Sequence, residues 1–215
     1  MDHKEKYTLS LVRDKVNTVF DIGAREDGIE FIEIVPNGEF HFFEPNKDFA
    51  DSLKSKIPVG ANAIVNQYGM WFENMDMAKY YMNTQSFIPH PFGISVDSGH
   101  LFNLRTIDWY VKENNIKSID YLKIDAEGAD YKILQGASNS IKLDMIKYLQ
   151  FEYWDGVKKF YDLLQNKYDM FFIDPSNDQL RALTSEVIHH IDNERIPSGA
   201  GGDIFCAHKK EEFKG

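Results

Sequence analysis

The chain has 215 residues and a formal net charge of −10, which argues against a nucleic-acid backbone or an anionic membrane surface as a partner, since both require clustered Lys and Arg. Its one cysteine, Cys206, excludes an internal disulfide and a cysteine-rich zinc site. The sequence has neither a signal-peptide pattern nor an apolar run of about 18 residues, so we expect a cytoplasmic protein.

Short apolar runs alternate with helical patterns along the chain, which is typical of a mostly parallel sheet covered by helices. Asn46 and Thr106 are predicted N-caps of two helices. The last two apolar runs leave room for a helix around residues 180–191 between them, and they suggest an antiparallel pair of strands at one edge of the sheet. No linker divides the chain, so we expect one domain over residues 1–215, either alone or as part of a larger protein. The expected strands cover residues 16–22, 40–43, 63–66, 77–82, 120–124, 148–151, 170–173 and 204–207.

Residues 85–99 interrupt this alternation. The segment contains Pro89, Pro91, Gly93 and Gly99 and has no periodic pattern, so we expect an irregular loop. Long loops inside compact domains often carry function, and we predict that this one lies over the substrate side of the site and is more mobile than the sheet.

The end of the first expected strand carries the first chemical signal. Asp21 is followed by a turn that begins at Gly23, and ligands of doubly wound sheets bind at the carboxyl ends of the strands. The turn matches neither G-x-G-x-x-G nor the phosphate-binding P-loop. An acid there would repel a pyrophosphate but could pair with a cationic ligand, such as the amino group of a methionine moiety. A plain strand–turn–helix with a surface acid is the alternative.

The second signal is Glu44, which ends the next strand 23 residues after Asp21 (44 − 21). An acid about 20 residues beyond the first turn is where a carboxylate holds a ribose diol. Together the two acids indicate a nucleoside ligand without a diphosphate, and S-adenosylmethionine (SAM) is such a ligand.

The third signal follows the apolar strand at residues 120–124. Asp125 and Glu127 come to the same edge of the sheet, and Gly128 is predicted to start the next helix. Two carboxylates there could act as a general base, orient a substrate hydroxyl or bind a divalent cation. Asp130 is interpreted as an acid favoured by the helix dipole.

The motifs VFDIGA, FFEPN and IDYLKIDAEGADYKILQGA, in this order, resemble those of the FkbM-type class I SAM-dependent methyltransferases. The resemblance implies a Rossmann-like α/β fold with a mostly parallel seven-stranded sheet, an antiparallel last strand and helices on both faces. Residues 23–28 depart from the GAN-x-G form of the family by one inserted residue. The cofactor-binding residues implied are Asp21, Gly23, Ala24, Arg25, Gly28, Glu44, Pro45, Asn46, Gln67, Tyr68 and Asp125.

The resemblance also implies O-methylation of a sugar or glycan hydroxyl with SAM as the cofactor. Asp125 is the first candidate for the base, followed by Glu127, Glu152 and His90. A divalent metal would acidify the hydroxyl, with Asp125 and Glu152 as its candidate ligands. Two alternatives remain open: a nicotinamide-dependent oxidoreductase on a Rossmann sheet, and a non-catalytic scaffold with the same fold.

Overall fold

The computed structural model describes residues 3–82, 87–89, 100–154, 156–174, 179–193 and 202–213. Its helices are α1 (His3–Val12), α2 (Glu30–Ile34), α3 (Lys47–Lys56), α4 (Ile107–Glu113), α5 (Asp130–Gln135), α6 (Ser138–Lys142), α7 (Lys158–Leu164) and α8 (Ser185–Asn193), with short 3-10 helices η1 (Arg13–Lys15) and η2 (Lys209–Glu211). Its strands are β1 (Thr18–Ile22), β2 (Glu39–Phe43), β3 (Asn62–Asn66), β4 (Gly69–Met70), β5 (Met75–Met82), β6 (Phe87–Pro89), β7 (His100–Arg105), β8 (Ile119–Ile124), β9 (Ile146–Tyr153), β10 (Tyr168–Ile173), β11 (Leu180–Ala182) and β12 (Gly202–His208).

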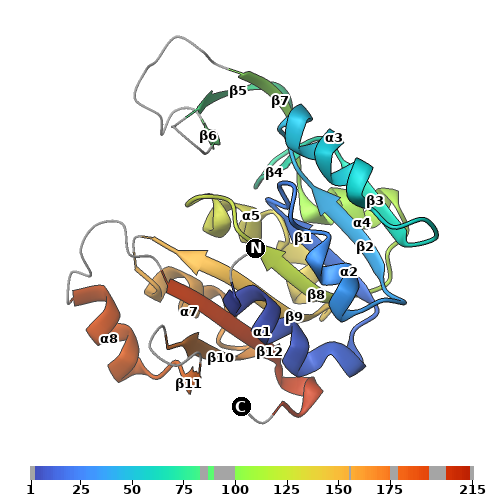
Figure 1. The fold of residues 1–215 in the computed structure, drawn as a ribbon. Coiled ribbons are helices and arrows are strands. Elements are labelled where there is room, and N and C mark those ends of the chain that lie inside the picture. Colours follow the sequence, from blue (N-terminus) through green and yellow to red (C-terminus); the bar gives the residue numbers. More distant parts are fainter. Residues whose placement is uncertain are drawn as a thin grey trace.

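The large sheet has the strand order β11-β10-β12-β9-β8-β1-β2-β3 (Figure 1). The strands β3, β2, β1, β8 and β9 run parallel, whereas β12 lies antiparallel between β9 and β10. The predicted mostly parallel fold with an antiparallel last strand is confirmed, and the three-residue strand β11 is added beyond β10. The two late strands do form the expected antiparallel pair, β10 with β12, at one end of the sheet, and only β11 lies outside this pair.

Helices cover both faces of this sheet, because buried side chains alternate along the strands. Phe20 and Ile22 of β1 pack in a core with residues of α4, α5, α6, α7 and α8, while Val19 packs on the other face with residues of α1, α2 and α3. Alternation of this kind follows from the two-residue period of a strand. Each face of the sheet therefore packs against its own apolar core, and the strands are held between the two cores.

A second sheet, with the order β4-β7-β5-β6, lies beyond the end of β3 (Figure 1). Its strand β6 falls within residues 85–99, so the expectation of an irregular loop was wrong for these three residues. These residues form a strand because they pair with β5, and a pairing between distant segments cannot be seen in a local pattern interrupted by Pro89. Residues 85–86 and 90–99 lie outside the described residues, and the predicted position and mobility of the loop stay predictions.

Both predicted N-caps are confirmed. The Asn46 side chain accepts a hydrogen bond from Asp48 N at the start of α3, and the Thr106 hydroxyl accepts one from Trp109 N at the start of α4. The helix expected around residues 180–191 begins later, because Leu180–Ala182 forms β11. Across the described ranges, no helix is both long and apolar enough to cross a membrane.

Candidate functional site

The ends of β1, β2 and β8 are tied together by backbone hydrogen bonds. Gly23 N donates to Phe43 O at 3.0 Å, and Asp125 N donates to Ile22 O at 3.0 Å. Parallel neighbouring strands end on the same side of a sheet, so the segments that follow β1, β2, β8 and β9 lie side by side. We call these strand ends and the residues that follow them the carboxyl edge.

The turn after β1 is packed directly against the end of β8. Gly23 has φ +80°, and a Cβ atom at this position would lie 1.9 Å from Asp125 O. Only glycine allows the two backbones to approach so closely. Ala24 N also donates to Phe43 O, at 3.3 Å.

Two non-glycine residues at the carboxyl edge have a left-handed backbone. Arg25 has φ 45° and Glu127 has φ 52°, and Glu127 is followed by Gly128 at φ 90°. Such conformations cost free energy and are concentrated at functional sites. The helix after β8 begins at Asp130, with Ala129 as its N-cap residue, and not at Gly128 as expected.

Glu44 lies between the turns that follow β1 and β2. Its Oε2 accepts a hydrogen bond from Arg25 N at 3.0 Å, and its Oε1 accepts one from Asn46 N at 2.8 Å. The residue is 4 % exposed, and burial raises the pKa of its carboxyl to about 7. Because each carboxylate oxygen has a second lone pair, both can also accept a hydroxyl, as a ribose diol requires.

Asp21 is buried beneath the turn and does not point freely outward. It is 1 % exposed, and its Oδ1 lies 3.1 Å from the ammonium of Lys123 on β8. Gly28 is packed beside it, because a Cβ atom there would lie 2.6 Å from Asp21 Oδ2. The predicted pairing of Asp21 with the amino group of a methionine moiety stays a prediction.

Asp125 is the more accessible of the two strand-end aspartates. Its side chain is 31 % exposed, and Oδ2 lies 3.7 Å from Lys123 Nζ. Glu127, two residues further on, is exposed. A reacting group at the carboxyl edge can therefore reach Asp125 without displacing buried side chains.

Two acidic side chains, Asp130 and Glu152, lie close enough to Asp125 to be affected by its charge, and Trp154 contacts the second of them. Asp130, at the start of α5, accepts a hydrogen bond from Glu152 N at 3.2 Å, and Glu152 Oε2 accepts one from the Trp154 indole at 3.2 Å. Burial, reinforced by the charge of Asp125, raises the pKa of Asp130 to about 7 and that of Glu152 to about 8. Trp154 itself is 47 % exposed.

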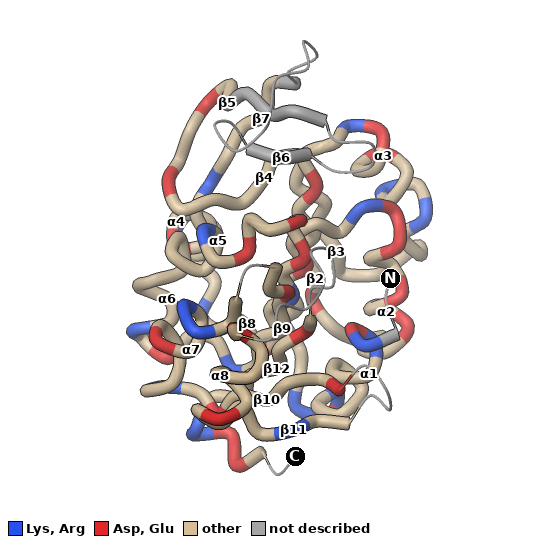
Figure 2. Tube along the Cα trace, turned by 90° about the vertical axis from the view of Figure 1, so that its left-hand side faces the viewer, with Lys and Arg blue, Asp and Glu red and all other residues tan. Residues whose placement is uncertain are grey.

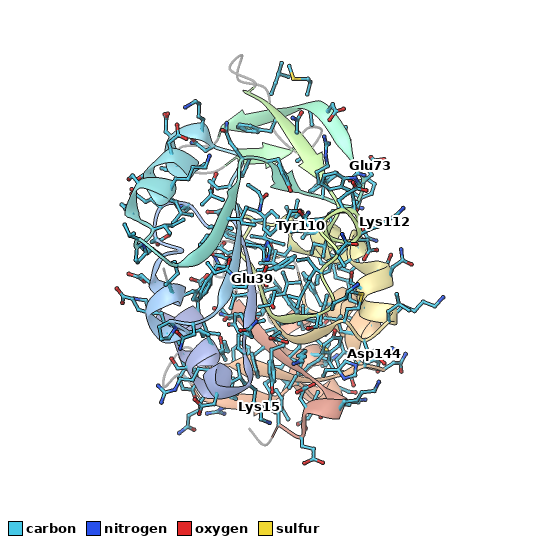
Figure 3. All side chains as sticks on the ribbon, turned by 90° about the vertical axis from the view of Figure 1, so that its right-hand side faces the viewer. Lys15, Glu39, Glu73, Tyr110, Lys112 and Asp144 are labelled. Carbon is cyan, nitrogen blue, oxygen red and sulfur yellow. The ribbon has the colours of Figure 1, made fainter. Side chains whose placement is uncertain are left out.

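Gln67 and Tyr68, which the family resemblance implied as cofactor-binding residues, follow β3. Asn66 Nδ2 donates to Phe42 O at 3.2 Å, and Tyr68 is half-buried with its ring centroid 6.0 Å from that of Phe43. Tyr110, labelled in Figure 3, is buried and receives a hydrogen bond from Asn66 Nδ2 at 3.3 Å. Gln67 is exposed and Pro45 is half-buried.

Sequence reasoning missed Lys123 and Glu5, and it underrated Asp130. The signal for Lys123 was present, since a lysine inside the apolar strand Ile119–Ile124 needs a buried partner. Asp130 does lie in the first turn of α5, as interpreted, but it is also 1 % exposed, and its Oδ2 has no hydrogen-bond partner among the residues that the structure describes. His90 lies outside the described residues.

No group of three or more His, Cys, Asp or Glu side chains within the described ranges is arranged to hold a metal ion. A separate charged cluster around Asp144 joins Lys167, Lys210 and His208. Asp144 lies just before the start of β9 at Ile146, and His208 ends the antiparallel strand β12, so both lie at the edge of the sheet opposite the carboxyl edge. This cluster is therefore not part of the carboxyl edge.

The raised pKa of Asp130 predicts that stability falls as the pH rises. The unfolded carboxyl titrates near its ordinary value of about 4, so the stability that its neutral form contributes is fully present below that pH and is lost as the pH rises through about 7. Asp130→Asn is expected to flatten this decline by a few kcal/mol, measured by urea unfolding across the same range. Asp162→Asn, at an exposed acid of α7, is the control and should leave the slope unchanged.

Comparison with solved structures places the sheet among class I methyltransferase folds. The chain is similar to the crystal structure of methyltransferase FkbM from Methylobacillus flagellatus KT, with a TM-score of 0.54 and 14 % identity over 89 % of this chain and 43 % of that chain. It is also similar to a putative rRNA-methylase from Clostridium thermocellum, with a TM-score of 0.52 and 8 % identity over 97 % of each chain. A third similar structure is an rRNA methylase from Streptococcus thermophilus, with a TM-score of 0.52 and 12 % identity over 96 % of this chain and 95 % of that chain. At these identities the likeness concerns the fold alone.

The family follows from the sequence match. The model of the methyltransferase FkbM domain matches residues 21–184, and the chain belongs to this family of SAM-dependent methyltransferases. No curated protein matches the chain. The chain spans less than half the length of the Methylobacillus flagellatus structure, so the activity of that whole protein is not carried over.

Proposed function

We propose that this methyltransferase transfers a methyl group from SAM to a hydroxyl group of a sugar or glycan. The observation that carries the proposal is the carboxyl edge itself. The backbone of Asp125, whose carboxylate is accessible, lies against the glycine turn after β1. The buried carboxylate of Glu44 accepts two backbone hydrogen bonds next to the same turn. These groups match a methyl-transfer centre beside a nucleoside site.

The residues present fit SAM. Glu44 would hold the ribose diol with the free lone pairs of its two oxygens, and Gly23 lets the turn after β1 pack against the backbone of Asp125. SAM is cationic at its sulfonium and its amino group, and acidic segments run down the middle of the molecule below the small sheet (Figure 2). An acidic edge lowers the free energy of a bound cation.

When bound, SAM supplies a sulfonium methyl group that an oxygen nucleophile can attack. The protein's task is to orient the acceptor and to take the hydroxyl proton. Asp125 is our candidate for the proton acceptor, because it is the accessible aspartate at this edge. Glu152, whose pKa is raised to about 8 by burial and by its acidic neighbours, is the second candidate.

An exposed aromatic ring supports a sugar as the acceptor. Trp154 follows β9 directly, and its indole nitrogen donates to Glu152 Oε2, so the ring is oriented relative to the carboxylates. Exposed aromatic faces stack on the apolar faces of sugar rings, and carboxylates accept hydrogen bonds from their hydroxyls. Trp71, in contrast, is buried and belongs to the core.

The test has two stages. Calorimetry with SAM, S-adenosylhomocysteine (SAH) and NAD should show binding of the first two and none of the third. Purified protein is then incubated with SAM and a panel of sugars, and mass spectrometry should find one added methyl group on an oxygen. A folded protein that binds neither SAM nor SAH, or that methylates only amines, would contradict the proposal.

Glu44→Ala is expected to weaken SAH binding by roughly 1.5–3 kcal/mol, because the change removes charge-assisted hydrogen bonds to the ribose. Isothermal calorimetry measures the loss. Glu26→Ala is the matched control, since Glu26 is an exposed acid in the neighbouring turn and pairs with Lys56. Equal SAH affinity in folded Glu44→Ala and wild-type protein would remove Glu44 from the site.

A further inference from the structure

The side chain of Lys123 is a buried cation at the carboxyl edge. Lys123 is 4 % exposed and lies in a strand whose other residues are also buried. Its ammonium lies 3.1 Å from Asp21 Oδ1, 3.2 Å from Glu5 Oε1 and 3.7 Å from Asp125 Oδ2. One cation thus joins carboxylates from three parts of the chain: β1, α1 and the segment after β8.

Burying charges is costly unless they are paired, and removing one partner leaves the others uncompensated. Without the ammonium, Asp21 and Asp125 would face each other with like charges near the turn at Gly23. Both would then rotate away or take up protons. The orientation of these two carboxylates therefore depends on Lys123.

Helix α1 contacts the ammonium through Glu5 and is anchored to the sheet by further polar contacts. Besides Glu5, α1 contributes Thr8, whose hydroxyl lies 2.7 Å from the Tyr121 hydroxyl and also donates to Gln150 Oε1. Lys4 Nζ lies 2.8 Å from Asp203 Oδ2. α1 precedes residues 21–184, so the α1 partner of each of these contacts lies outside the part of the chain that matches the family model.

We propose that Lys123 is a positioning residue whose ammonium fixes the carboxylates of Asp21 and Asp125, and that α1 helps to hold this ammonium through Glu5. This inference rests on the proposed function, because it assigns Lys123 to the SAM site at the carboxyl edge. Asp21 is the member on the side of the cofactor turn, and Asp125 is the member on the side of the acceptor. Lys123 therefore affects both cofactor affinity and turnover.

The electrostatics agree with this geometry. Burial would lower the pKa of Lys123, but the charges of Asp21, Glu5 and Asp125 raise it well above its ordinary value, so the ammonium stays charged. Burial raises the pKa of Asp21, and the Lys123 charge opposes this rise. Removing that charge would raise the pKa of Asp21 further and extend its neutral form to higher pH.

The test compares Lys123→Met with Lys147→Met by calorimetry with SAH. Lys147, on the neighbouring strand β9, pairs with the buried carboxylate of Asp120 at 2.8 Å but lies away from the carboxyl edge. Lys123→Met should lower SAH affinity by about tenfold or more. As the pH is lowered, the variant should also begin to lose SAH affinity at a higher pH than wild type does. Lys123→Arg should recover part of the affinity, and Lys147→Met should bind SAH as wild type does.

A second pair of variants covers the case in which Lys123→Met does not fold. Glu5→Ala removes the α1 contact to the ammonium, whereas Lys6→Ala removes an α1 ion pair to Glu30 of α2. Only Glu5→Ala should weaken SAH binding, by about threefold or more. Equal SAH affinity within each pair, at an unchanged pH profile, overturns the inference. Wild-type protein that binds no SAH contradicts the proposed function and the inference with it.

Discussion

Asp125→Asn is expected to lower kcat by roughly 10²–10⁴-fold, the range for loss of a general base, while SAH affinity stays nearly intact. The physical reason is that asparagine keeps the size of the side chain but cannot take the acceptor's proton. Asp125 is the accessible aspartate of the carboxyl edge, whereas Asp21 is buried beneath the turn. Steady-state kinetics with the acceptor found by the sugar screen, together with SAH calorimetry, measure the two effects separately.

Glu127→Gln is the matched control for this experiment. Glu127 is exposed and lies two residues further on, so its loss should change KM more than kcat. A titration with divalent ions and EDTA accompanies both variants, because sensitivity to EDTA would make Asp125 a metal ligand and not a base. Near-wild-type turnover in Asp125→Asn would transfer the role to Glu152.

The dependence of rate on pH separates the two carboxyls. Burial raises the pKa of Glu152 to about 8, so a reaction that uses it as the base would gain rate as the pH rises through that value. That limb of the profile would vanish in Glu152→Gln. A reaction that uses Asp125 would not depend on the titration of Glu152, so Glu152→Gln should leave its rate profile near pH 8 unchanged.

The arrangement of parallel strands that brings the strand ends together could be predicted from the sequence. Alternating apolar runs identify β1, β2, β8 and β9, and parallel neighbours must end on one side of the sheet. Asp21, Glu44 and Asp125 lie at those ends for this reason. Their assigned roles toward SAM stay predictions, whereas their neighbourhood follows from the topology.

Other parts of the molecule depend on contacts between distant residues. α1 has a weak apolar pattern, with Leu9 and Val12 in the core, and much of its docking uses the polar contacts of Glu5 and Thr8. The small sheet begins with the two-residue strand β4, which has no periodicity to detect. Neither the partners of Lys123 nor the pairing of β6 with β5 can be derived from local spacing.

The neighbourhood of Gly23 and Asp125 gives the second large expected effect. Gly23→Ala should destabilise the fold by about 3 kcal/mol or more and abolish measurable SAH binding. A Cβ atom at position 23 would lie 1.9 Å from Asp125 O, and the neighbour is backbone that a rotamer change cannot move. Either the turn after β1 or the end of β8 must shift, and both carry the groups assigned to the site.

Gly60→Ala separates the steric clash from the backbone strain in this experiment. Gly60 also has a left-handed backbone, with φ +90°, but no atom lies within 4 Å of the point that a Cβ atom would occupy there. Alanine at this position should cost only about 1 kcal/mol, from the unfavourable φ alone. Urea unfolding and SAH calorimetry on both variants give the comparison. If Gly23→Ala is no more destabilised than Gly60→Ala and binds SAH normally, then the close approach of the two strand ends is not needed for the cofactor site.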